Sequence, residues 1–113
     1  MAAQPNALAH ADPVALALYR QLLDSIQPFG PFQEEVKKSS IHLVRSSPFA
    51  GVHFRKRAIA LTIEAAIPID SPRVLKTEQV STNRWHLDTK LTIDGDIDRE
   101  LLAWLRDAYN LCA

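Results

Sequence analysis

Cysteine is scarce in this chain, whose 113 residues include only Cys112. One cysteine cannot form an intrachain disulfide, and this usage is typical of a reducing compartment, so we expect a cytoplasmic protein. A lone thiol most often packs as a small hydrophobe, and we predict that role for Cys112. No apolar run approaches the roughly 20 residues that span a bilayer, so we expect no membrane association.

Short catalytic motifs are missing as well. The three glycines form no phosphate-binding loop, and there is no Cys-x-x-Cys, His-Glu-x-x-His or Gly-x-Ser-x-Gly sequence. We therefore predict no catalytic residues, no metal site and no cofactor, and the sequence favours a protein that is not an enzyme.

Net charge is zero, with 13 basic and 13 acidic residues, but the two signs are separated along the chain. Positions 37–57 hold six basic residues and no acidic one, while positions 94–100 hold four acidic residues. We interpret the acidic cluster as the start of a helix, because it lacks the run of oxygen ligands that a calcium loop needs. The basic block is a candidate contact for an anionic partner.

Two segments have the periodicity of amphipathic helices. Asp12 and Pro13 are a typical helix start, with a capping carboxylate followed by proline, and an apolar stripe follows as far as Ile26. The second helix is predicted to begin at an Asp96 cap and to keep one apolar face as far as Cys112.

Between the helices the period changes to two residues, which is typical of strands. We predict an α+β fold with an N-terminal helix, an antiparallel sheet of about five strands and a C-terminal helix, both helices packing on one face of the sheet. A flexible tail at 1–11 would precede a single domain at 12–113. The predicted strands cover residues 40–44, 51–55, 59–64, 73–80 and 85–93.

The alternation also predicts how the strands pair. In the first hairpin we expect Ile41 opposite Phe54 and Leu43 opposite Val52, which places His42 directly across from His53. In the second hairpin we expect Phe54 opposite Ile59 and Val52 opposite Leu61. Two imidazoles across from one another could share a metal ion only with a third ligand, and whether His86 or Asp88 supplies it depends on a strand order that the sequence does not fix.

If both helices cover the apolar face, the polar face of the sheet stays open. We predict that a ligand or partner surface lies there, formed by Lys38, His42, His53, Arg55, His86 and Asp88. Ser40, Thr62, Glu64 and Lys90 fall on the same face of the pattern. Additional anion contacts are predicted at Lys37, Lys56, Arg57 and Arg73, although Arg73 also fits a turn held by an ion pair with Asp70.

Three functions follow from these features. The leading hypothesis is a non-enzymatic binding module whose open face contacts a protein partner, an anionic ligand or a second copy of the chain. Nucleic-acid binding through the basic hairpin 37–57 is the second, although the balanced net charge and the lack of a nucleic-acid motif count against it. An enzyme acting with a metal or on a small molecule is the third.

Several segments also resemble a bacterial family of uncharacterised domains, the domain of unknown function number fifty-six fifty-five. The matching stretches are Lys38-Ser39-Ser40-Ile41, Phe49-Ala50-Gly51-Val52-His53-Phe54, Asp70-Ser71-Pro72-Arg73, Arg84-Trp85 and Ala103-Trp104-Leu105-Arg106-Asp107-Ala108-Tyr109. The resemblance implies no activity.

The chain departs from this family at four positions on or near the predicted open face. Relatives often carry aromatic residues where this chain has Gly51 and His53, and a pair of histidines where it has Leu87 and Asp88. A metal site built on that pair would lack a ligand at Leu87. The order helix, sheet, helix is also similar to frataxin-like domains, but the first helix has no acidic ridge of the kind that iron binding in those proteins would suggest.

Overall fold

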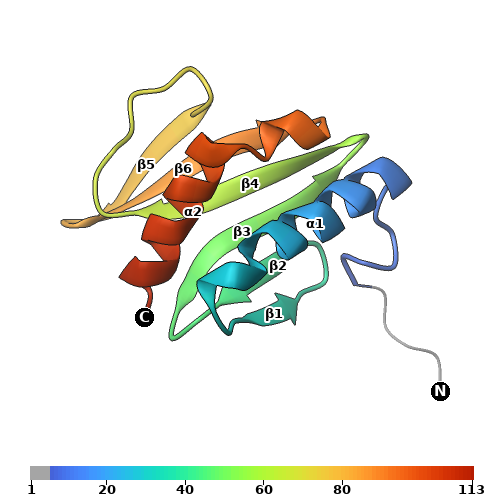
Figure 1. Ribbon diagram of the computed structural model, residues 1–113, viewed down its shortest axis with the longest axis horizontal. Coiled ribbons are helices and arrows are strands. Elements are labelled where there is room, and N and C mark those ends of the chain that lie inside the picture. The colour runs from blue at the N-terminus through green and yellow to red at the C-terminus, as the bar shows by residue number, and fades with distance from the viewer. Residues whose placement is uncertain (1–5) are drawn as a thin grey trace.

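The computed structural model describes residues 6–113, and part of the predicted tail, residues 1–5, lies outside the described residues. Within residues 6–11, the backbone N–H of Ala7 donates to the carbonyl of Lys37 at 3.0 Å, and Ala7 is buried. The elements follow in the order α1 (Pro13–Ile26), η1 (Gln27–Phe29), β1 (Gln33–Val36), β2 (Ile41–Val44), β3 (Pro48–Arg55), β4 (Ala58–Ala65), β5 (Lys76–Ser81), β6 (Arg84–Leu91), η2 (Asp94–Asp96) and α2 (Arg99–Leu111) (Figure 1).

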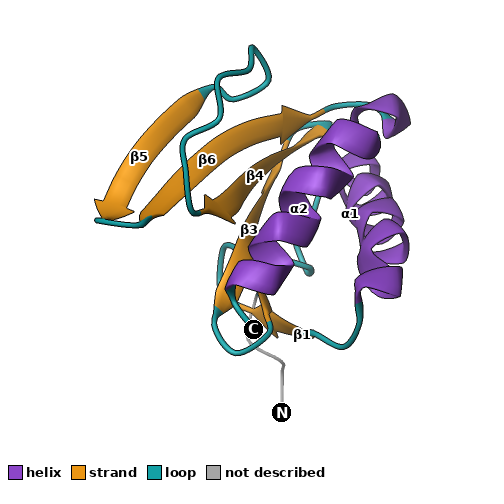
Figure 2. Cartoon of the chain, turned by 60° about the vertical axis from the view of Figure 1, so that its left-hand side comes forward, coloured by secondary structure: helices purple, strands orange, loops and turns teal. Residues whose placement is uncertain are grey.

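The fold is α+β, as predicted, with one layer of sheet and one layer of helices. The six strands are all antiparallel and lie in the order β1-β2-β3-β4-β6-β5. Both helices pack on the same face, where they contact β3 and β4 (Figure 2). Strand β5 lies at the edge away from the helices, and all six of its residues are exposed.

The two helix starts differ in how well the sequence predicted them. Asp12 caps α1 as expected, because its carboxylate accepts the backbone N–H groups of Val14 and Ala15 at 2.9 and 3.2 Å. The predicted Asp96 cap of α2 is wrong, since Asp98 accepts the N–H of Leu101 at 3.0 Å. Asp96 instead closes the short helix η2, which inserts one extra turn between β6 and α2.

Strand β1 is the additional strand that the sequence did not reveal. All four of its residues are exposed and two are glutamates, so the segment lacks the apolar alternation of a half-buried strand. It pairs only with β2, at the edge of the sheet. Glu34 is anchored to α1 because the hydroxyl of buried Tyr19 donates to its carboxylate at 2.5 Å.

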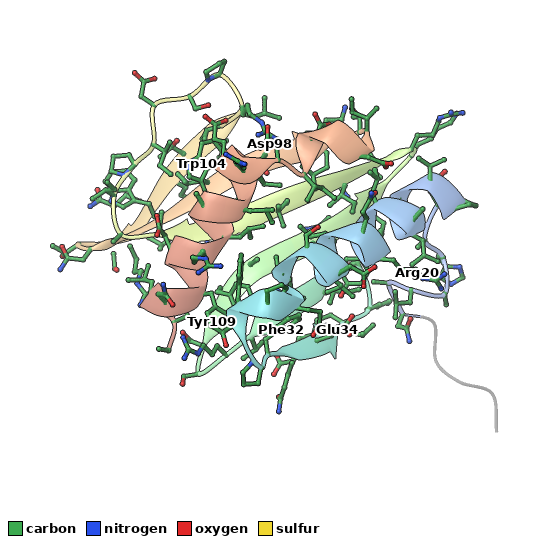
Figure 3. The ribbon with its side chains drawn as sticks, viewed as in Figure 1. Arg20, Phe32, Glu34, Asp98, Trp104 and Tyr109 are labelled. Carbon is green, nitrogen blue, oxygen red and sulfur yellow. The ribbon has the colours of Figure 1, made fainter. Side chains whose placement is uncertain are left out.

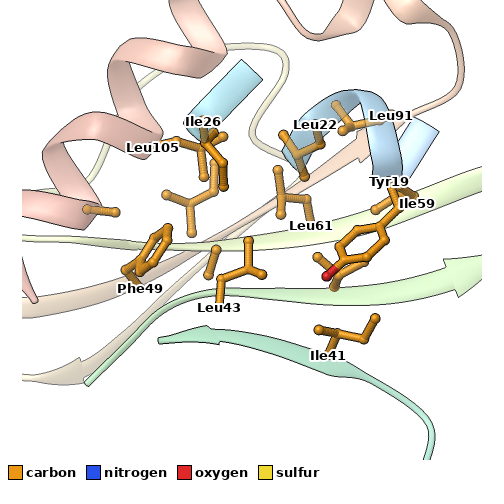
Figure 4. Packing of buried hydrophobic residues seen from close by; sticks show 14 of the residues in the cluster. Tyr19, Leu22, Ile26, Ile41, Leu43, Phe49, Ile59, Leu61, Leu91 and Leu105 are labelled. Atoms are coloured by element: carbon orange, nitrogen blue, oxygen red, sulfur yellow. The ribbon is translucent and has the colours of Figure 1, made fainter. Parts of the chain in front are cut away.

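A single apolar core fills the space between the sheet and the helices (Figure 4). Leu22 and Ile26 of α1, Leu105 of α2 and Leu61 of β4 are all fully buried in it. Phe49 adds an edge-on aromatic contact with Tyr109, at a ring-centroid distance of 5.4 Å. The largest buried residues of the core are Tyr19, Phe49, Leu22, Ile26, Ile41, Leu43, Ile59, Leu61, Ile63, Leu87, Leu91 and Leu101.

Cys112, near the C-terminal end of the described chain, is buried, as predicted, and its thiol lies 3.4 Å from the carbonyl of Pro48.

Over residues 6–113, no helix has both the length and the apolar character needed to cross a bilayer.

Candidate functional site

The face of the sheet opposite the helices carries a continuous row of residues across all six strands. The register places Glu35, His42, Gly51, Thr62, Asp88 and Lys76 side by side, one from each strand. We call this surface the open face. Gly51 has no side chain, so the surface of the open face is recessed near the middle of the sheet.

The first hairpin is shifted by two residues from the predicted pairing. Ile41 lies opposite Val52, not Phe54, and His42 lies opposite Gly51, not His53. The strand begins earlier than predicted because Pro48 occupies its first position beside a bulge, where a missing N–H is tolerated. A shift of two keeps every side chain on its expected face. The second hairpin, with Phe54 opposite Ile59, is confirmed.

A cavity of about 310 Å³ opens on this face above Gly51, and we call it the imidazole hollow. Three of the four histidines reach its wall, one from each of β2, β3 and β6. Its lining is formed by His42, Pro48, Ala50, Gly51, His53, Thr62, Glu64 and His86. The residues that the structure describes nevertheless include no group of three His, Cys, Asp or Glu side chains able to hold a metal ion.

Glu64 organises one end of the imidazole hollow. Its carboxylate lies 2.6 Å from Nε2 of His86 and 3.6 Å from the guanidinium of Arg84. The same guanidinium reaches the carbonyl of Leu111, at the end of α2, at 3.4 Å. His86 is therefore held in place by a carboxylate that is itself anchored to the helix.

A second cavity, of about 670 Å³, adjoins the first, and we call it the basic hollow. Its lining includes four lysine or arginine residues and a single acid, Asp88. Thr62 donates to the Asp88 carboxylate at 2.7 Å, so this acid already has a partner. The four cations are Arg55, Lys56, Lys76 and Lys90.

His53 lies between the two hollows and lines both. Partial burial, followed by the positive charge of Arg55 and the proximity of His42, lowers the pKa of His53 below its usual 6.5, against a smaller opposing effect of Asp88. The ring is therefore neutral at pH 7 and gains a charge only in more acidic solution.

The other predicted surface residues occupy loops at one end of the sheet. Lys37 and Lys38 lie in the β1–β2 loop, and Lys56 and Arg57 form the β3–β4 turn, with all four exposed. Lys37 lies 3.5 Å from the Glu35 carboxylate. Ser40, which the alternation placed on the open face, is buried because it precedes β2 and turns inward.

Arg73 does not join this surface. Its guanidinium lies 2.7 Å from Asp98 and 3.5 Å from Glu100, and it also donates to the carbonyl of Asp96. Burial opposes its charge, but the hydrogen bonds and charges of Asp98 and Glu100 outweigh this and raise the pKa of Arg73. The predicted turn therefore binds the start of α2, and Asp70 is not its partner.

The sequence did not reveal a third cavity, of about 490 Å³, on the helix side of the sheet. It lies between Trp104 of α2, the β4–β6 surface and the loop that joins β4 to β5. The only signal for it was a pair of isoleucines, Ile67 and Ile69, in a loop where apolar residues are uncommon.

Comparison with known proteins identifies the chain at the level of its family. Neither curated proteins nor solved structures gave a match. A family model described as "Domain of unknown function (DUF5655)" matches residues 6–112, which is nearly the whole chain. The chain therefore belongs to this family of domains of unknown function.

Proposed function

We propose that this chain is a binding module without catalytic activity, and that its open face holds an acidic partner protein. The basic hollow is the observation that supports this function. Arg55, Lys56 and Lys90 make no ion pair within the described residues, so their charges are available to a partner. The only acid in the hollow, Asp88, is occupied by Thr62.

The open face also offers apolar contact area beside these charges. Leu75, which lines the basic hollow, is 66% exposed, and its backbone N–H donates to the backbone carbonyl of Asp88 at 2.8 Å. A partner that buries Leu75 gains hydrophobic stabilisation, while its carboxylates meet the surrounding lysines and arginines. Charges placed around an apolar contact in this way favour specificity and rapid association.

A decaglutamate peptide is a suitable probe of this function. We expect it to shift the amide signals of β3, β4 and β6 in nuclear magnetic resonance spectra, and to bind at least about tenfold more weakly to a double Arg55→Ala, Lys90→Ala variant. Arg20→Ala combined with Arg99→Ala is the matched control, because both arginines are exposed, Arg20 on α1 (Figure 3) and Arg99 at the start of α2.

An equal loss of decaglutamate affinity in the test variant and the control variant would mean that the open face is only one charged surface among others. Self-association through this face would also contradict an acidic partner, because the basic hollow would then face another copy of itself. Sedimentation of the native chain and of the Arg55→Ala, Lys90→Ala variant distinguishes that outcome.

Nucleic-acid binding is the second candidate, and one observation favours it. The loop with Lys37 and Lys38 and the turn with Lys56 and Arg57 lie toward the same end of the sheet. Clustered cations bind phosphates with an affinity that falls steeply between about 50 and about 200 mM salt. The open face has no Phe, Tyr or Trp in either hollow on which bases could stack, so this candidate is weaker. Lack of binding to DNA at low salt would remove it.

A further inference from the structure

The cavity between α2 and the β4–β5 loop lies on the other side of the sheet from the open face. Its volume of about 490 Å³ is within the range of small-molecule sites. Fully buried Ile63 and Leu87 form its floor, Trp104 and Leu111 form the helix wall, and the loop closes the third side. The complete lining is Ile63, Glu64, Ala65, Ala66, Ile67, Ile69, Leu87, Trp104, Asp107, Asn110 and Leu111.

Two arginines fix the helix wall of this cavity at both ends. Arg73, from the β4–β5 loop, binds Asp98 at the start of α2 at 2.7 Å. Arg84, from the start of β6, binds the carbonyl of Leu111 at its end. Figure 3 labels Asp98 beside the start of α2 and Trp104 on the helix. The wall is thus tied to the β4–β5 loop at one end and to the sheet at the other, and the cavity is built into the fold.

The loop side of the cavity exposes an apolar side chain that the fold does not cover. Ile67 is 68% exposed although it lines the cavity. Burying such a side chain is favourable, and the described residues leave most of it exposed. An apolar ligand in the cavity would gain this area together with the floor and the Trp104 ring.

The polar groups of the cavity are acidic or neutral. No lysine or arginine belongs to its lining, whose polar residues are Glu64, Asp107 and Asn110. Glu64 is engaged by His86 and Arg84, whereas Asp107 makes no side-chain hydrogen bond or ion pair within residues 6–113. Asp107 therefore supplies an unpaired negative charge at the rim of an apolar cavity.

From this combination we propose that the cavity is a binding site for a small organic amine that carries an aromatic or aliphatic ring. The ring lies against Ile67 and Trp104, above the buried floor, and the ammonium group pairs with Asp107. The Arg73 guanidinium already lies 6.0 Å from the centroid of the Trp104 ring, so recognition of the ammonium group is assigned to Asp107. Asp107 repels an anionic ligand of the same shape.

The test compares three probes of one shape, which are 1-naphthylmethylamine, 1-naphthalenemethanol and 1-naphthoic acid. The chain has two tryptophans, so the indole signal of Trp104 is identified by its retention in a Trp85→Phe variant. We expect the amine to shift this signal and the methyl signals of Ile67 and Ile69 saturably, with the alcohol weaker and the acid weakest.

Two variants assign the charge and the place of binding. Asp107→Asn should weaken amine binding by about fivefold and leave alcohol binding unchanged, since only the ion pair is lost. Asp24→Asn, an exposed acid on α1, is the matched control and should change neither. Ala66→Trp should fill the cavity from the exposed loop and abolish binding of all three probes.

The site is overturned if the amine produces no saturable shift, or if amine and acid bind equally well. It is also overturned if Asp107→Asn and Asp24→Asn have the same effect, or if Ala66→Trp leaves amine binding intact. Arg55→Ala should leave amine binding unchanged, so the outcome is independent of the function proposed for the open face.

Discussion

Arg73 donates to the same carboxylate oxygen of Asp98 that caps α2, at 2.7 Å, while the N–H of Leu101 reaches that oxygen at 3.0 Å. One atom thus starts the helix and ties it to the segment before β5. Because the cap and the ion pair share an acceptor, the position of α2 and the path of the β4–β5 loop depend on each other.

Replacing Asp98 should separate the two roles. Asp98→Ala is expected to lower the free energy of unfolding by about 1–2 kcal/mol, since it removes the cap and the partner of Arg73 together. Asp98→Asn should lower the free energy of unfolding by less, because asparagine also caps helices. Urea denaturation measures both. Asp94→Ala is the control, since Asp94 contributes no side-chain hydrogen bond in the described chain, and an equal loss there would contradict the shared-acceptor role.

Acid should destabilise the protein through this same region. A backbone hydrogen bond from Thr92 lowers the pKa of Asp96, and one from Leu101 followed by Arg73 lowers the pKa of Asp98. Their folded-state pKa values lie below the unfolded value near 3.8, so the stabilisation is complete above that pH and is lost as pH falls through the lowered pKa values. An Asp96→Asn, Asp98→Asn variant should show a shallower loss of stability in acid, and an unchanged slope would contradict this.

Glycine should stabilise the β3–β4 turn more than Arg57 does. Its φ of 56° is in the left-handed region, which costs an ordinary residue about 1 kcal/mol. Arg57→Gly is therefore expected to raise the free energy of unfolding by about 0.5 kcal/mol after the greater unfolded-state entropy of glycine is offset. Lys56→Gly, at the neighbouring position without positive φ, should lower it. Thermal unfolding compares the two, and a loss in both would show that the turn is not strained.

The contact between Tyr19 and Glu34 should stabilise the edge strand β1. Burial, followed by the hydrogen bond and charge of Glu34, raises the pKa of Tyr19, so its hydroxyl stays protonated and remains a hydrogen-bond donor at neutral pH. Tyr19→Phe is expected to lower the free energy of unfolding by about 1–2 kcal/mol. Amide exchange in β1 should accelerate more than in β4. Uniform exchange across both strands would contradict a local role.

Protonation of His53 offers a measurement on the open face itself. Its midpoint in a nuclear magnetic resonance titration should lie below 6.5, and Arg55→Ala should move it upward because a neighbouring positive charge is removed. The unfolded chain takes up this proton at higher pH, so His53 reduces stability as pH falls from 6.5 toward the lowered value. Binding of decaglutamate should strengthen over the same range. An unmoved midpoint in Arg55→Ala would contradict the placement of the two side chains.

The alternation of residues predicted the faces of the central strands but not the pairing of the first hairpin. His42 and His53 were expected opposite each other, and both do lie on the open face. A pattern with period two cannot distinguish a register from one shifted by two residues. The observed register also shifts between Leu43 and Val44, and bulges depend on turn geometry that composition does not specify.

Charged residues misled the prediction where long-range partners decide the structure. Glu34 and Glu35 lack the apolar alternation of a strand, yet they pair with β2, and the hydroxyl of Tyr19 binds Glu34. Arg73 was expected to contact an anion, yet Asp98 and Glu100, from a distant part of the chain, occupy its guanidinium. No local pattern reports which distant charge a side chain will meet.

Local caps and periodic burial were enough to predict the two helices, the central antiparallel strands and the polar character of the open face. The strand order, the two hollows of the open face and the cavity beside Trp104 became visible only in the folded chain. Each of these requires segments far apart in the chain to meet, and the contacts that bring them together, from Arg73 to Asp98 and from Arg84 to Leu111, form only when the core has packed.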